Sequence, residues 1–124
     1  MKQFNEEKKP IGLCCISPTI AAKVFPGCTV TVGSATESVS PFSKLLVLYG
    51  DTSRVLTPQE EWPNAAAAST IEAMGSKHKE TTLEEVCVDD AHNLVTSAAY
   101  MCEAPVHRVH DNVAKMVVTV LDRA

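Results

Sequence analysis

Apolar residues occur in short runs, separated by proline, glycine and serine, along this chain of 124 residues. The run from Pro10 to Ile16 is continuously apolar, which is the pattern of a strand buried on both faces of a parallel sheet. Ser17 offers an N-cap oxygen, and Pro18 offers a fixed φ at the first position of a helix that continues to Phe25. The pattern therefore predicts a strand, a sharp turn and a helix.

Three further segments have a clear pattern. Residues 28–33 alternate as a second strand, with Val30 and Val32 on one face. Residues 63–74 begin with proline, are rich in alanine and precede Gly75, which predicts a helix. Residues 85–89 and 94–97 read as the strands of a hairpin, because the loop between them holds Asp and Asn, which tolerate turn conformations.

The segment from Glu103 to the end has the strongest helical periodicity. Apolar residues recur there at spacings of three and four, which predicts an amphipathic helix of about five turns. They are Val106, Val109, Val113, Met116, Val117 and Val120. Residues 34–61 have no such pattern apart from one apolar island, Phe42 to Tyr49, which either pairs as a strand or lies exposed.

The order of these elements predicts an α/β fold, and the length fits a single domain, since domains commonly hold about 100–150 residues. Apolar residues make up 45% of the chain and charged residues 21%, which argues against general disorder. The net charge of −4 gives no electrostatic footprint for nucleic acid, so we expect no nucleic-acid partner. No apolar run approaches the ~20 residues that cross a bilayer, so we expect no membrane partner.

The five cysteines point to reduced thiols. Their number is odd, and they form no C-x-x-C or zinc-finger spacing, which predicts neither a metal site nor a disulfide framework. Cys14 and Cys15 are neighbours, whose Cα atoms lie about 3.8 Å apart, whereas a disulfide favours about 5.5 Å. A disulfide between Cys14 and Cys15 is therefore not expected. We also expect no cofactor.

Cys15 is the candidate nucleophile. It is nearer than Cys14 to the predicted turn, where the unpaired amides of the following helix would favour a thiolate. Cys14 is expected to point into the sheet. The alternative is that both cysteines are small buried hydrophobic residues, as most free cysteines are.

The segment PIGLCCISP, followed by AAKV and VTVG, resembles the elbow region of the class I glutamine amidotransferase-like (PfpI) superfamily. More narrowly, the chain resembles the ElbB (enhancing lycopene biosynthesis) family and its mitochondrial animal relatives. The resemblance resumes at Trp62 and includes the segments IEAMGSKH and VTSAAYM. It implies a flavodoxin-like parallel sheet with flanking helices, and it covers most of the chain outside residues 34–61.

The resemblance also implies a set of site residues. Cys15 matches the elbow cysteine of the family, and Ser17 and Pro18 match the residues of the elbow turn. Thr96 and Ser97 belong to a segment, residues 96–100, that lines the same pocket in the family. The implied function is weak glyoxalase-like action on small reactive carbonyls. The alternative is a non-catalytic, truncated member that is redox-sensitive or binds a partner.

The chain departs from the family in three respects, of which one is Ser34, at a position where animal members carry a His. Family members have a longer amino-terminal half, which supplies the first strands of the sheet, an acidic residue beside the cysteine and a glycine-rich loop. Nothing before Pro10 can serve as that half, so we expect residues 1–124 to form a partial domain with an atypical insertion at 34–61. An incomplete sheet exposes an edge and apolar helix faces, which predicts a homo-oligomer.

The resemblance implies a mitochondrial location, although the first ten residues, MKQFNEEKKP, lack the Arg-rich, acid-poor pattern of a transit peptide. The alternative is a cytoplasmic location.

The histidines and Cys102 are weaker candidates. We expect His78 and His92 to be surface residues, and His107 to pair with Asp111 four residues later on the last helix. His107 and His110 have a spacing that can bind metal, but the sequence places no third ligand beside them. Cys102 is either a buried spectator or a resolving thiol that approaches Cys15.

Overall fold

Strands and helices alternate in the computed structural model of this chain, which describes residues 1–38 and 61–124. The elements up to residue 30 are α1 (Lys2–Glu6), β1 (Ile11–Cys14), α2 (Pro18–Val24) and β2 (Thr29–Val30). Those after residue 61 are α4 (Ala66–Ala73), β3 (Lys77–His78), β4 (Cys87–Asp89), β5 (Leu94–Ser97), the 3-10 helix η1 (Ala99–Met101) and α5 (Val106–Asp122).

The strands form two small sheets. The larger has the order β1-β5-β4, in which β1 is parallel to β5, and Cys14 lies opposite Ser97. Strands β4 and β5 are antiparallel and form the predicted hairpin. Strands β2 and β3 form a parallel pair. The α/β fold, the hairpin and the long C-terminal helix are thus confirmed, and the hairpin makes the larger sheet mixed.

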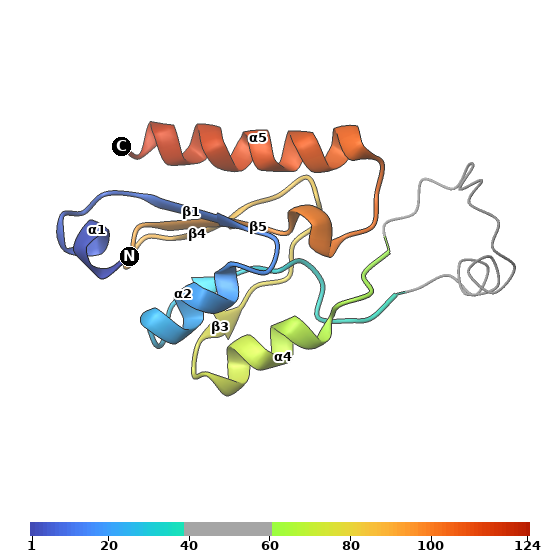
Figure 1. Ribbon diagram of the computed structural model, residues 1–124, viewed down its shortest axis with the longest axis horizontal. Coiled ribbons are helices and arrows are strands. Elements are labelled where there is room, and N and C mark those ends of the chain that lie inside the picture. The colour runs from blue at the N-terminus through green and yellow to red at the C-terminus, as the bar shows by residue number, and fades with distance from the viewer. Residues whose placement is uncertain (39–60) are drawn as a thin grey trace, which may run out of the picture.

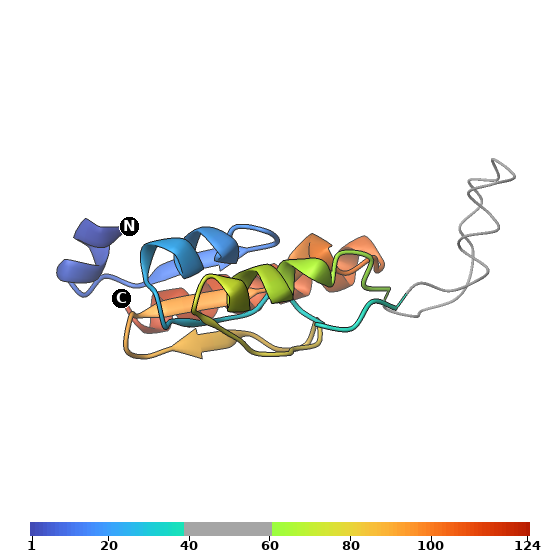
Figure 2. The ribbon, with the colours of Figure 1, turned by 90° about the horizontal axis from the view of Figure 1, so that it is seen from below.

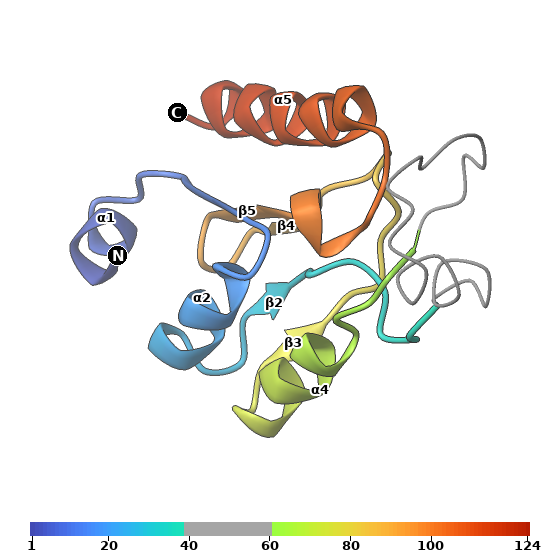
Figure 3. The same cartoon turned by 45° about the vertical axis from the view of Figure 1, so that its right-hand side comes forward.

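Helices cover both faces of the larger sheet. Helix α5 lies along one face and packs against β1, β5 and η1, while α2 and α4 lie on the other side with β2 and β3 (Figures 1 and 3). Helices α2 and α4 pack against each other there (Figure 2). The largest fully buried side chains of the core come from α4, β5, β2 and α5, and include Ile71, Leu94, Val30 and Val109. The core is mainly aliphatic.

Strand β1 is less buried than its apolar sequence predicted. It pairs only with β5 among the described strands, so it is an edge strand. Ile11, Leu13 and Cys14 are half-buried, and Gly12 is exposed. A side chain at Gly12 would meet Val120 of α5, because its Cβ would lie 2.9 Å from Val120 Cγ2. Helix α5 packs against β1, so the apolar run reflects cover by a helix and not by strands on two edges.

Two elements and two element boundaries also differ from expectation. Helix α1 and strand β3 were not predicted, and α4 begins at Ala66, three residues after the expected proline. The second strand stops at Val30, since Gly33 turns with φ of +101° under the ring of Trp62. The apolar island at 42–49 and most of the expected insertion at 34–61 lie outside the described residues.

Candidate functional site

Cys15 occupies the turn between β1 and α2 in a backbone conformation that is uncommon for a residue with a side chain. Its φ is +60°, in the left-handed region. Such a conformation costs roughly 1–3 kcal/mol and persists only where the surroundings impose it. One constraint is the amide of Cys15, which donates a hydrogen bond of 3.1 Å to the carbonyl oxygen of Ser97. The thiol is half-buried at the carboxyl end of the strand.

Ser17 holds the turn from the other side. Its hydroxyl donates to the carbonyl oxygen of Cys14 at 2.7 Å and accepts from the amide of Cys14 at 3.1 Å. The expected N-cap bond to helix α2 is absent, because Ser17 already has helical φ and ψ and its hydroxyl is turned back toward β1. Pro18 takes the first helical position as predicted, and it is buried. The serine thus closes the elbow and does not cap the helix.

Thr96 and Ser97 lie next to β1, but their side chains are engaged elsewhere. Both residues have no exposed surface. The hydroxyl of Thr96 accepts from the amide of Thr31 at 2.9 Å, and the hydroxyl of Ser97 lies 3.7 Å from the sulfur of Met116. Ser97 reaches Cys15 through its backbone alone, so neither side chain lines an open pocket beside the thiol in this structure.

The other cysteines lie in less reactive surroundings. Burial raises the pKa of Cys14, and the neighbouring Cys15 raises it further. Burial likewise raises the pKa of Cys28 and of Cys87, which are buried. Cys102, at the end of η1, is only 1% exposed. All five cysteines are free, and no Cys15–Cys102 disulfide is formed. A thiol with a raised pKa is rarely a thiolate near pH 7, so Cys14, Cys28 and Cys87 are poor nucleophiles there.

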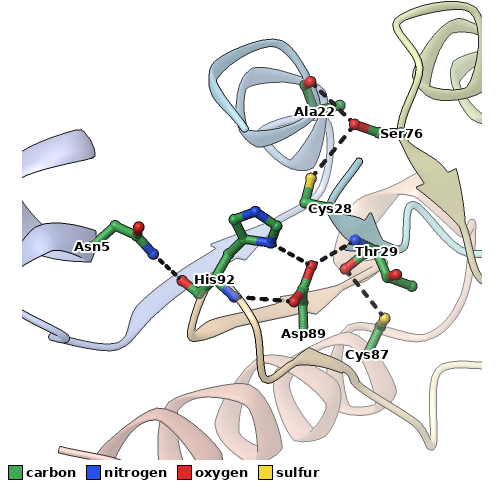
Figure 4. A network of polar contacts seen from close by, with 8 residues as sticks. All are labelled: Asn5, Ala22, Cys28, Thr29, Ser76, Cys87, Asp89 and His92. Atoms are coloured by element: carbon green, nitrogen blue, oxygen red, sulfur yellow. Dashed lines mark hydrogen bonds and ion pairs between the residues drawn. The ribbon is translucent and has the colours of Figure 1, made fainter. Parts of the chain in front are cut away.

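A polar cluster around Asp89 fastens the hairpin to β2 (Figure 4). Asp89 accepts hydrogen bonds from the amide of Thr29 at 2.7 Å and from the amide of His92 at 3.1 Å, and its Oδ2 lies 3.0 Å from Nδ1 of His92. Burial alone would raise the pKa of Asp89, but these hydrogen bonds outweigh it and lower the pKa. The carbonyl of His92 in turn accepts from Asn5 at 2.7 Å. The cluster ties α1, the hairpin and β2 together.

His107 and His110 are exposed on α5, as expected for helix-flank histidines, whereas His78 is not a surface residue. His78 is half-buried, and its Nε2 accepts a hydrogen bond of 3.3 Å from the amide of Val32. Burial lowers the pKa of His78, against the opposing effects of Glu72 and Glu80. Asp111 pairs with its neighbour His110 at 3.1 Å, so the expected pair with His107 is wrong.

Within 1–38 and 61–124, no three His, Cys, Asp or Glu side chains converge as metal ligands. No helix in these ranges is long and apolar enough to span a bilayer.

The amino-acid pattern pointed to part of this arrangement. The spacing of Asp89 and His92, three residues apart across a hairpin loop, was a usable signal for their contact. The hydrogen bonds from Ser17 to Cys14 could not be predicted from the sequence, because a Ser-Pro pair is also typical of an ordinary N-cap.

The fold places the chain in a structural class. It matches the crystal structure of an isoprenoid biosynthesis protein with an amidotransferase-like domain from Ehrlichia chaffeensis, with a TM-score of 0.66 and 20% sequence identity. The match covers 99% of this chain and 43% of that one. The chain therefore has the fold of part of an amidotransferase-like domain, as expected for the flavodoxin-like class.

Sequence relatives show which amidotransferase-like proteins the chain resembles. The chain is 38% identical over 122 residues to the ES1 protein homolog, mitochondrial, of Rattus norvegicus. It is equally similar to the human glutamine amidotransferase-like class 1 domain-containing protein 3, mitochondrial. Each alignment covers 98% of this chain but only 38% of the relative. No family model matches the chain. The resemblance to the animal mitochondrial glutamine amidotransferase-like proteins is thus confirmed.

Proposed function

We propose that this glutamine amidotransferase-like chain uses Cys15 as a reactive elbow thiol toward small carbonyl compounds. The observation that carries the proposal is the φ of +60° at Cys15, at the junction of β1 and α2. A strained strand-to-helix turn that presents a nucleophile at the carboxyl edge of a sheet is a recurring catalytic arrangement. Burial raises the pKa of Cys14, Cys28 and Cys87, and Cys102 is only 1% exposed, whereas Cys15 is half-buried at the elbow.

The proposed reaction converts glyoxal to glycolate without an external oxidant. The thiolate of Cys15 adds to one aldehyde carbon, a C–S bond forms, and the carbonyl oxygen takes a proton. A proton then moves from the carbon that carries sulfur to the second aldehyde carbon through an enediol, which gives a thioester. Water cleaves the C–S bond, releasing glycolate and restoring the thiol.

The elbow residues have distinct parts in this proposal. Ser17 positions the turn through its two bonds to Cys14, and the bond from Cys15 to Ser97 holds the elbow against β5. Thr96 is a supporting residue, since its hydroxyl is bonded to the Thr31 amide. Among the described residues, no carboxylate or histidine is hydrogen-bonded to the Cys15 thiol, which fits weak turnover, because no base is held beside the nucleophile.

The test is release of glycolate from glyoxal by purified protein. We expect Cys15→Ser to lower turnover at least 100-fold, whereas the matched variant Cys14→Ser retains it. Equal turnover by wild type and Cys15→Ser would refute the carbonyl proposal.

A second candidate is redox sensing by the same thiol. It is favoured by the absence of a hydrogen-bonded base near Cys15 in residues 1–38 and 61–124, because oxidation needs an accessible thiol but no catalytic partner. Mild peroxide would then modify Cys15 alone. Oxidation spread evenly over all five cysteines would contradict this candidate. A mitochondrial location is proposed from the names of the relatives, and fractionation of cells would test it.

A further inference from the structure

Asn112 is a polar residue on the buried face of α5. It is 1% exposed and lies on the same face as the buried Val109. Its side-chain oxygen accepts a hydrogen bond of 2.9 Å from the amide of Ala99. Its side-chain nitrogen donates to the carbonyls of Leu83 at 2.8 Å and Glu85 at 3.0 Å. A buried amide that is bonded to three backbone groups fixes their positions, because leaving any of them unpaired would be costly.

The partners of Asn112 determine the orientation of its side chain. Ala99 offers an N–H, whereas Leu83 and Glu85 offer carbonyl oxygens. A flipped side chain would bring its NH₂ group toward an N–H and its oxygen toward two carbonyls. The oxygen of Asn112 is therefore held facing Ala99.

Ala99 has a conformation that requires such a constraint. Its φ is +46°, in the left-handed region, which alanine rarely adopts. This conformation persists only where the surroundings impose it. The bond from the Ala99 amide to Asn112 is one constraint, and the burial of Ala99, which is 1% exposed, is another.

The turn at Ala99 is directly connected to the elbow. Strand β5 ends at Ser97, two residues before Ala99, and Ser97 lies opposite Cys14 of β1. The carbonyl of Ser97 accepts the hydrogen bond from the amide of Cys15. A left-handed residue therefore follows each of two paired strands, at the same edge of the sheet. The position of the Ser97 carbonyl depends on the turn that follows it.

We propose that Asn112 is a positioning residue for the thiol of Cys15. By holding the amide of Ala99, it fixes the turn after β5, and this turn fixes the Ser97 carbonyl that holds Cys15 in its left-handed conformation. This role rests on the proposed function of Cys15 as a reactive thiol. Asn112 acts through the backbone and not by contact with the carbonyl compound.

The test compares two substitutions of Asn112 by limited alkylation and peptide mapping. Asn112→Leu has a similar volume but no acceptor, whereas Asn112→Asp keeps an oxygen for the amide of Ala99. We expect Asn112→Leu to lower the alkylation rate at Cys15, relative to the buried Cys28, at least about fivefold, because a small displacement of a reacting group lowers its rate strongly. Asn112→Asp should keep most of this rate ratio, a rescue that a loss of packing alone would not produce.

The matched control is Val109→Ala, a change on the buried face of the same helix. It loosens the packing of α5 without removing a hydrogen bond, so the ratio of the rates at Cys15 and Cys28 should stay at the wild-type value. An unchanged or raised ratio in Asn112→Leu would overturn the proposal. Equal falls in Asn112→Leu and in either Asn112→Asp or Val109→Ala would do the same.

Hydrogen exchange gives a second readout in the wild-type protein, which applies even if Asn112→Leu does not fold. If the turn at Ala99 holds the Ser97 carbonyl, every opening that frees the amide of Ala99 also frees that of Cys15. The Cys15 amide should therefore be no more protected than the Ala99 amide. A protection factor at Cys15 about ten times that at Ala99 would contradict the proposal, because Cys15 would then stay bonded while the turn opens.

Alkylation separates the role of Asn112 from the proposed function, because it needs no turnover of glyoxal. If the wild type forms no glycolate, the carbonyl reaction is refuted, and the alkylation rates at Cys15 still decide the role of Asn112. If the wild type forms glycolate and Asn112→Leu has an unchanged alkylation ratio, only the role of Asn112 is refuted.

Discussion

At the scale of single residues, the elbow depends on the hydroxyl of Ser17, which bonds to the preceding strand and not to helix α2. Ser17 satisfies both the donor and the acceptor of Cys14, which keeps the turn closed where Cys15 takes its left-handed conformation. The Ser-Pro pair correctly predicted where α2 begins, but the direction of the serine hydroxyl depends on tertiary packing. Local sequence therefore located the elbow and did not reveal what closes it.

Ser17→Ala should lower the free energy of unfolding by about 1–2 kcal/mol, because it leaves the partly buried amide of Cys14 unpaired and removes one of the two hydrogen bonds to the carbonyl of Cys14. The matched control is Thr19→Ala, which removes an exposed hydroxyl bonded to the carbonyl of Ile16 in the same turn. Its effect should stay within about 0.5 kcal/mol. Urea unfolding followed by the fluorescence of Trp62 measures both, and equal losses would show that Ser17 does not hold the elbow.

His78 should make stability depend on pH. Burial lowers its pKa in the folded state, so the unfolded chain binds the proton more readily. The contribution of neutral His78 to the free energy of unfolding is complete above the pKa of about 6.5 in the unfolded chain. It is lost as pH falls toward the lower pKa of the folded state. His78→Gln, whose amide oxygen can still accept from Val32, should remove the decline in unfolding free energy below about pH 6.5. An identical pH profile for the variant would contradict this assignment.

Asp89 should affect the stability of the fold at a more acidic pH than His78 does. Because hydrogen bonds outweigh burial and lower its pKa, its contribution is present above the unfolded pKa of about 3.9 and is lost as pH falls through the folded value. The stability contributions of His78 and Asp89 are therefore lost in different pH ranges, that of Asp89 in the more acidic one.

At the scale of elements, the contact of α5 with β1 explains why a glycine stands in the middle of an apolar strand. The apolar run correctly predicted a strand, and the spacing of valines correctly predicted the helix. Neither pattern could show that the helix lies directly on Gly12, since the two segments are about a hundred residues apart in the sequence. Long-range contacts of this kind set the burial of β1, and a local sequence pattern does not contain them.

Gly12→Ala should cost about 1–3 kcal/mol of stability, because the added Cβ would lie 2.9 Å from Val120 Cγ2. Val120→Ala makes room, so the double variant should be more stable than the sum of the single effects predicts, by about 1 kcal/mol. Additive losses in denaturant unfolding would show that the close approach to α5 does not constrain this position.

At the scale of the whole molecule, one core joins α2, β2, α4, β5 and α5. Cys28 and Cys102 belong to this core, and Cys14 and Cys15 pack against it. The fold class and the relationship to glutamine amidotransferase-like proteins followed from the sequence and are confirmed. The surroundings of each thiol could not be predicted in the same way. Burial and the pKa of a cysteine depend on neighbours far apart in the chain, as the contact of Cys28 with Ser76 shows.

The most direct test of the account is the rate at which each cysteine reacts with a small electrophile in the native protein. Limited alkylation at neutral pH, followed by peptide mapping with mass spectrometry, gives those rates for all five thiols, provided that Cys14 and Cys15 are separated by fragmentation. The account predicts that Cys15 reacts first, at least ten times faster than Cys14, Cys28, Cys87 or Cys102. Preferential reaction at any other cysteine, or similar rates at all five, would contradict the assignment of Cys15 as the elbow nucleophile.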